Sequence, residues 1–194
     1  MDLTYRSTRG DRTAYTASQA VLKGLASDGG LFVPDQLPRL DKSLEELQGL
    51  SYQELAYEVM KLFLTDYTEE ELKACIAGAY DEKFDTPQIA PLVEKHGAFY
   101  LELFHGATIA FKDMALSILP HLMVTAAKKN HAEHEIVILT ATSGAVSYTH
   151  LDVYKRQIMP VLVLIFVFCR ADPAFEPVEY LAGAQVQFPE HYRN

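Results

Sequence analysis

The sequence contains no tryptophan and only two cysteines, Cys75 and Cys169, which lie far apart and match no paired spacing of metal ligands. This scarcity indicates neither a disulfide framework nor a zinc site, and it is typical of a reducing compartment. Basic residues are also few, because 17 Lys and Arg face 26 Asp and Glu and give a formal net charge of -9. Such a charge opposes attraction to phosphate backbones and anionic membranes, so we expect no nucleic-acid partner.

Long apolar runs are missing as well. The one extended run, 158–169, includes Pro160 and is shorter than the roughly 20 residues that a membrane-spanning helix needs. Residues 1–6 lack the apolar core of a signal peptide. We therefore expect a cytoplasmic protein without a membrane partner. Since 49% of the 194 residues are hydrophobic and 22% are charged, the chain is expected to be globular.

Residues 1–84 favour a small, mainly helical N-terminal region. Residues 18–25 have a helical pattern, and 31–34 form a short strand-like segment that ends at proline. Two capping boxes, Ser51 with Glu54 and Thr68 with Glu71, then predict the starts of two amphipathic helices, the first extending over about 51–65. The second carries an apolar stripe at helical spacing, formed by Leu72, Cys75, Ile76, Ala79 and Tyr80.

The sequence changes in character after this region. Residues 98–104 and 135–141 have the composition of strands, and 112–129 has that of a helix between them. This order is typical of a parallel α/β sheet that is covered on both faces. Pro120 falls inside the helical segment and predicts a kink or a break. We interpret 85–144 as the start of an α/β domain.

The densest group of polar and glycine residues is 105–113, between the expected strand and helix. Ligands of open α/β sheets bind beyond the carboxyl ends of the strands, which places Lys112 where chemistry usually occurs. Taken alone, a lysine before a helix is an ordinary solvated charge. A nucleophilic role would require that desolvation disfavour the charged form of the amine.

Four segments resemble motifs of threonine synthases and occur in that family's order. Residues 103–113, Leu-Phe-His-Gly-Ala-Thr-Ile-Ala-Phe-Lys-Asp, are similar to the cofactor-lysine segment, although Ala107 stands where the family usually has proline. The other similarities are to the two N-terminal signatures and to the start of the substrate loop, at 5–10, 24–34 and 140–144. The resemblance covers residues 1–144 and implies a partial tryptophan-synthase-like fold, which is fold type II of the pyridoxal-phosphate enzymes.

The resemblance implies an enzyme that converts O-phospho-L-homoserine and water to L-threonine and phosphate. It implies that Lys112 holds pyridoxal 5'-phosphate as a Schiff base, and that the substrate is bound by Thr142, Ser143 and Gly144. In such enzymes the cofactor ring is the electron sink for carbanions, while the protein supplies placement and charge. Without the resemblance, residues 142–144 are an ordinary turn at a strand end.

Other polar residues have weaker patterns. We expect His105 to fix its loop and Asp113 to cap the following helix, and we assign neither a chemical step. His131 and His134 could share a helical face, but no third ligand is evident, so we interpret them as a solvated polar loop and expect no metal site. The sequence around Ser143 lacks the Gly-x-Ser-x-Gly elbow of hydrolases.

The resemblance ends abruptly at Gly144. Threonine synthases continue with Asp-Thr-Gly and a helix, whereas residues 145–157 resemble translated cloning sequence. Our hypothesis is that 145–194 are an anomalous tail that is not native to the enzyme. The glycine-rich loop for the cofactor phosphate and most of the sheet then have no counterpart here. We therefore expect negligible activity from this chain alone, and aggregation through uncovered strand edges and apolar faces.

Two other functions remain open at this point. The acidic helical region 41–84 could be a non-catalytic surface that binds a partner. The chain could also belong to another enzyme of the same cofactor fold, such as a threonine dehydratase or a cysteine synthase. Those relatives lack the N-terminal signatures, which favours threonine synthase.

Overall fold

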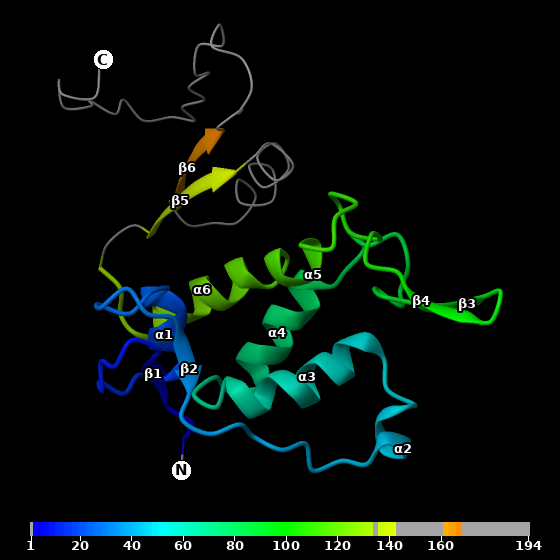
Figure 1. Ribbon diagram of the computed structural model, residues 1–194, viewed down its shortest axis with the longest axis horizontal. Coiled ribbons are helices and arrows are strands. Elements are labelled where there is room, and N and C mark those ends of the chain that lie inside the picture. The colour runs from blue at the N-terminus through cyan, green and yellow to red at the C-terminus, as the bar shows by residue number, and fades with distance from the viewer. Residues whose placement is uncertain (1, 134–135, 143–160, 168–194) are drawn as a thin grey trace, which may run out of the picture. The chain divides into compact units, whose positions relative to one another are not determined.

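A computed structural model describes residues 2–133, 136–142 and 161–167 (Figure 1). The chain divides into two compact units, Met1–Ala132 and Glu133–Asn194, and each is described by itself. The first unit contains the described helices and the loop that carries Lys112.

The N-terminal segment folds as a two-stranded ribbon with a helix. β1 (Tyr5–Ser7) pairs antiparallel with β2 (Phe32–Pro34), and α1 (Ala17–Lys23) lies between them in sequence. Thr16 begins α1 with a capping box, because its side chain accepts a hydrogen bond from the third helical amide. The helix and the strand that the sequence predicts in this segment are confirmed.

Three helices follow the ribbon: α2 (Leu44–Leu47), α3 (Tyr52–Phe63) and α4 (Glu69–Ala79). Each begins with a Ser or Thr that accepts from the third helical amide, while the Glu at that position accepts from the cap amide. The boxes predicted at Ser51 and Thr68 are confirmed. The box at the start of α2 is a further one that was not predicted.

The apolar stripe predicted on α4 is buried, and none of its members is more than 3% exposed: Leu72, Cys75, Ile76, Ala79 and Tyr80. These side chains form one core with residues of α6 (Leu119–Lys129), including Leu122 and Ala126. α6 also packs against α1. Burial of apolar surface between these helices is the main source of stability for the unit.

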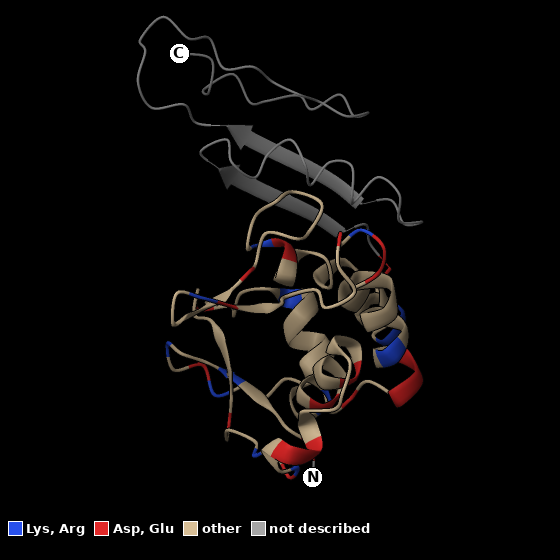
Figure 2. Cartoon of the chain, turned by 90° about the vertical axis from the view of Figure 1, so that its right-hand side faces the viewer, with Lys and Arg blue, Asp and Glu red and all other residues tan. Residues whose placement is uncertain are grey.

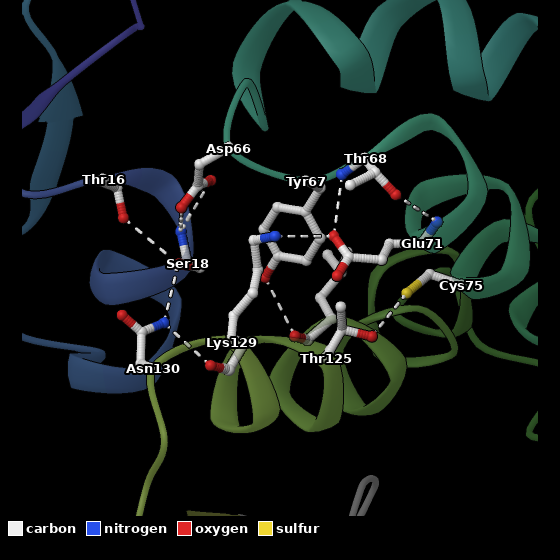
Figure 3. Close-up of polar contacts among 12 residues, drawn as sticks. Thr16, Ser18, Asp66, Tyr67, Thr68, Glu71, Cys75, Thr125, Lys129 and Asn130 are labelled. Carbon is white, nitrogen blue, oxygen red and sulfur yellow. Dashed lines mark hydrogen bonds and ion pairs between the residues drawn. The ribbon is translucent and has the colours of Figure 1, made fainter.

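Polar contacts also tie α6 to the rest of the unit (Figure 3). The side-chain amide of Asn130 donates to Ser18 Oγ at 2.9 Å, and the backbone amide of Ser18 donates to the Asp66 carboxylate. The buried hydroxyl of Tyr67 donates to the carbonyl of Leu122 at 3.0 Å. These bonds join residues 112, 48 and 55 positions apart, so they fix tertiary rather than local structure.

The helix predicted over 112–129 is broken into two. α5 (Asp113–Leu116) ends before α6 begins, and Pro120 lies in the first turn of α6. A proline there leaves no helical hydrogen bond unmade, because first-turn amides have no partner within the helix. The break expected at Pro120 is therefore confirmed. It separates the short helix after Lys112 from the helix that packs in the core.

The pairing predicted for the strand over 98–104 is wrong. β4 (Ala98–Leu101) pairs antiparallel with β3 (Leu92–Lys95) and, within the described part of the chain, with no other strand. The reason is the two-residue turn at His96 and Gly97, where φ values of 53° and 75° suit a tight hairpin. The hairpin is largely exposed on both strands.

The second unit contains two described strands. β5 (Ile136–Thr142) and β6 (Val161–Val167) pair in parallel along their full length. β5 confirms the strand predicted over 135–141, whereas β6 lies in the apolar run for which no element was predicted. Among the residues placed by the structure, no helix has both the length and the apolar character needed to span a membrane.

Candidate functional site

Lys112 lies at the junction between a loop and α5. Its backbone is already helical, with φ of -63° and ψ of -22°, and it occupies the position that precedes the helix. The side chain is exposed, and within the described residues its amine has no hydrogen bond or ion pair. Residues 2–133 thus do not supply the desolvation expected for a nucleophilic lysine. They do leave the amine accessible to a ligand.

The loop before Lys112 has a tight backbone. Ile109 has a φ of 58°, which is unusual for a β-branched residue, and its amide donates to the carbonyl of Gly106 at 3.0 Å. Gly106 is buried, and a Cβ atom on it would lie 2.5 Å from the Cβ of Asp113. Only glycine fits at this position without moving Asp113, so the two ends of the loop are in direct contact.

Asp113 closes the loop with its side chain. It is buried, with 4% exposure. Its Oδ2 accepts the backbone N–H of Thr108 at 2.7 Å, and its Oδ1 accepts the Thr108 hydroxyl at 2.6 Å. The prediction that Asp113 caps the helix is therefore wrong. Asp113 is the first residue of α5, and its carboxylate turns back to the loop because both oxygens find donors there.

His105 holds the other end of the loop, as the sequence predicts. Its Nδ1 lies 2.5 Å from Asp85 Oδ1 and its Nε2 lies 2.9 Å from Glu102 Oε2. The Asp85 amide donates to the carbonyl of His105 at 3.0 Å, and the ring of Phe104 stacks on the imidazole. Hydrogen bonds to Glu102 and to Asp85 raise the pKa of His105 above its ordinary value.

The other candidate residues are placed differently. Thr142 is the last residue of β5, in the second unit, while Ser143 and Gly144 lie outside the described residues. His131 is exposed in a turn after α6, which confirms the polar loop predicted for it, and His134 lies outside the described residues. In the described part of the chain, no group of three ligating side chains could hold a metal ion.

The two N-terminal segments that resemble family signatures meet in space. Asp28 Oδ1 accepts from the Ser7 hydroxyl at 2.6 Å and from the Gly30 amide at 3.0 Å, and its Oδ2 accepts from the Asp11 amide. Hydrogen bonds from Ser7 and Gly30 lower the pKa of Asp28. A Cβ on Gly30 would lie 2.1 Å from Ser7 Oγ, so the glycine allows the two segments to approach.

Two contributors to the loop were not predicted from the sequence. Thr108 belongs to the motif segment, but no role was assigned to it, and Asp85 lies 20 positions before His105. A signal for Thr108 does exist, because a hydroxyl residue shortly before an Asp in a glycine-containing loop favours side-chain closure of a turn. No local signal pairs Asp85 with His105, because their contact depends on the tertiary fold.

Four of the five acidic side chains of α3 and α4 have a hydrogen-bond or ion-pair partner among the described residues, the exception being Glu70. Glu69 pairs with Lys73 at 2.5 Å, and Glu71 pairs with Lys129 at 2.9 Å while also capping its helix. Figure 2 shows acidic and basic positions interspersed over the described segments, without a single basic face in this view. Such a surface is that of an ordinary solvated helix pair.

Comparison with known proteins identifies what these segments are similar to. A family model described as the threonine synthase N terminus matches residues 4–80. Threonine synthases of Schizosaccharomyces pombe and Pseudomonas aeruginosa are 40% and 42% identical to the chain over 152 and 157 residues. The matches cover 73% and 78% of this chain but 29% and 32% of the relatives, so the chain spans about a third of their length.

Two solved structures are similar in fold. A PLP-bound threonine synthase from Brucella melitensis has a TM-score of 0.73 at 31% identity, over 84% of this chain and 36% of its own. The yeast threonine synthase has a TM-score of 0.72 at 30% identity, over 86% and 36%. These similarities confirm the predicted fold class, a partial tryptophan-synthase-like α/β fold, and they do not favour the acidic binding module or the other enzymes of that fold.

Proposed function

The chain belongs to the threonine synthase family, whose N-terminal portion it matches, and from this premise we propose that its residues serve the threonine synthase reaction. In that reaction, O-phospho-L-homoserine and water give L-threonine and phosphate. We assign to the chain the part of the enzyme that carries the cofactor lysine. The observation that carries this proposal is the placement of Lys112, whose accessible amine follows a loop held at both ends by carboxylates.

The residues around Lys112 fit pyridoxal 5'-phosphate as the group to be held. Among the described residues, no carboxylate pairs with the Lys112 amine, which leaves the amine available for covalent attachment to an aldehyde. Ile109 and Phe111, close to Lys112 in sequence, are 75% and 66% exposed and offer apolar surface for an aromatic ring. The bound cofactor supplies an electron sink for carbanions. Lys112 Nζ is the base we assign to accept and return a proton.

We assign substrate binding to Thr142, Ser143 and Gly144, with a small phosphorylated amino acid as the partner. Thr142 ends a parallel strand at its carboxyl end, which is where ligands of open α/β sheets bind. Hydroxyl and backbone N–H groups at that point would donate to the substrate carboxylate. The chain has only two cysteines, and one of them, Cys75, is a buried free thiol. This supports a cytoplasmic location, where thiols stay reduced.

We further propose that this chain alone has negligible activity. Residues 1–84 and 85–144 would be the N-terminal region and the start of the cofactor domain, and 145–194 would not continue the enzyme. Re-sequencing the source DNA across the codons for residues 142–158 tests the last point. A reading frame that continues into Asp-Thr-Gly supports the proposal that 145–194 do not belong to the enzyme. A genomic origin for 145–194 refutes that proposal.

Trapping of the cofactor tests the role of Lys112. The purified full chain is incubated with pyridoxal phosphate, reduced with borohydride and mapped by peptide mass. We expect the cofactor mass to concentrate on Lys112 and to be lost from that peptide in Lys112→Ala. Lys73→Ala is the matched control, because Lys73 is an exposed lysine that pairs with Glu69, and its loss should leave the label on Lys112 unchanged.

Two results would contradict the proposal. Label spread evenly over the surface lysines would remove the support for Lys112 as the cofactor lysine. Release of phosphate from O-phosphohomoserine by the purified chain, abolished in Lys112→Ala, would keep Lys112 as the cofactor lysine but would refute the negligible activity.

A further inference from the structure

We propose that Asp113 is a positioning residue, which acts with Thr108 to fix the backbone from which the Lys112 side chain extends. The inference rests on the proposed function, since it concerns the lysine to which we assign the cofactor. It adds a role for two residues to which the proposed function assigns no contact with substrate or cofactor.

The carboxylate of Asp113 is fully engaged. One oxygen accepts the Thr108 backbone amide at 2.7 Å and the other accepts the Thr108 hydroxyl at 2.6 Å. The Asp113 amide donates to the carbonyl of Ala110 at 3.0 Å, so the same residue binds the loop at two points. Because Asp113 is only 4% exposed, little solvent competes for these bonds.

The backbone of the loop between Gly106 and Asp113 is conformationally constrained. Ile109 keeps a positive φ, and strained residues of this kind persist only where their surroundings hold them. Gly106 packs so closely on Asp113 that a Cβ atom would not fit between them. The contacts between Gly106, Thr108 and Asp113 therefore hold the backbone just before Lys112 in one conformation.

The backbone of Lys112 is restricted in the same way, because a peptide bond joins it directly to Asp113. Its carbonyl accepts the amides of Ala115 at 3.1 Å and of Leu116 at 2.8 Å, which fixes its backbone in the first turn of α5. What remains free is the side chain, which is exposed. A reactive group whose backbone is preset loses less freedom when it reaches its target, and this is the advantage that we attribute to Asp113.

The test separates positioning from general stability. The variants are Asp113→Asn, which weakens the bonds to Thr108, and Thr108→Val, which removes only the hydroxyl. Thr108→Ser restores that hydroxyl and serves as the rescue. Tyr67→Phe is the control, because it removes a buried hydrogen bond to α6 and leaves the loop untouched. All are made in the full chain, and their melting temperatures are measured.

Two readouts are compared. The first is hydrogen exchange at the Thr108 amide, which we expect to become about tenfold faster in Asp113→Asn, because the amide no longer has a charged acceptor and its hydrogen bond is weaker. The second is the share of borohydride-trapped pyridoxal phosphate found on Lys112 relative to the other lysines. We expect this share to fall about fivefold or more in Asp113→Asn and Thr108→Val, and to stay at the wild-type value in Thr108→Ser and Tyr67→Phe.

Each result decides the matter. A wild-type Lys112 share that persists in both loop variants overturns the inference, and so does an equal fall in Tyr67→Phe, since that fall would reflect stability alone. If Asp113→Asn does not fold, Thr108→Val against Thr108→Ser carries the test with the carboxylate in place. No label on Lys112 in the wild type overturns the proposed function and this inference together, whereas unchanged label in the variants overturns the inference alone.

Discussion

Truncation of Leu72 should weaken the first unit more than truncation of a leucine at its surface. Leu72 is 1% exposed and belongs to the core that α4 shares with α6. Leu72→Ala removes buried methyl groups and leaves a cavity, which costs about 2–5 kcal/mol of the free energy of unfolding. For a unit of this size, a loss near 3 kcal/mol corresponds to a fall in melting temperature of about 10 °C.

Leu44→Ala is the matched control. It is the same substitution in a helix, but the Leu44 side chain is 80% exposed. We expect it to change the free energy of unfolding by no more than about 0.5 kcal/mol. Thermal and urea unfolding of the full chain, followed by far-ultraviolet circular dichroism, gives both values. Equal destabilisation by the two variants would refute the assignment of the α4 stripe as the core.

Three further variants test other contacts. Hydrogen bonds to Glu102 and Asp85 raise the pKa of His105, so its stabilising effect is complete below the unfolded-state pKa of about 6.5 and is lost as pH rises through the folded-state pKa. Melting temperatures should therefore fall as pH rises above about 6.5, and His105→Gln should flatten that fall. Gly106→Ala should cost roughly 1–3 kcal/mol in urea unfolding, because the added methyl meets Asp113, and a neutral result would contradict the close approach. Tyr67→Phe should cost about 1 kcal/mol, and a larger loss would mean that the hydroxyl does more than bond to Leu122.

The helices of the first unit could be predicted because their signals are local. A capping box spans four residues and an apolar stripe about nine, so Ser51, Thr68 and the α4 stripe are readable before any tertiary contact is known. The break at Pro120 is equally local, since it depends on one missing amide.

The hairpin and the partners of the loop could not be predicted in the same way. The composition of β4 is that of a strand, but composition does not determine which strand it pairs with, and the tight turn at Gly97 favours the antiparallel hairpin over a parallel sheet. The bond between Asp85 and His105 depends on where the chain returns after 20 residues. The direction of the Asp113 carboxylate depends on donors in the preceding loop, and helix position alone favours the cap that was expected.

The position of α6 at the end of the first unit has a consequence for synthesis on the ribosome. The stripe on α4 is complete at Tyr80, but the part of its cover that α6 supplies begins only at Leu119, about 40 residues later. At a synthesis rate of about 5–20 residues per second, the surface of the stripe that packs on α6 lacks that cover for roughly 2 to 8 s. During that interval the emerging polypeptide is a substrate for chaperones that bind apolar surface, and the arrival of α6 ends that exposure.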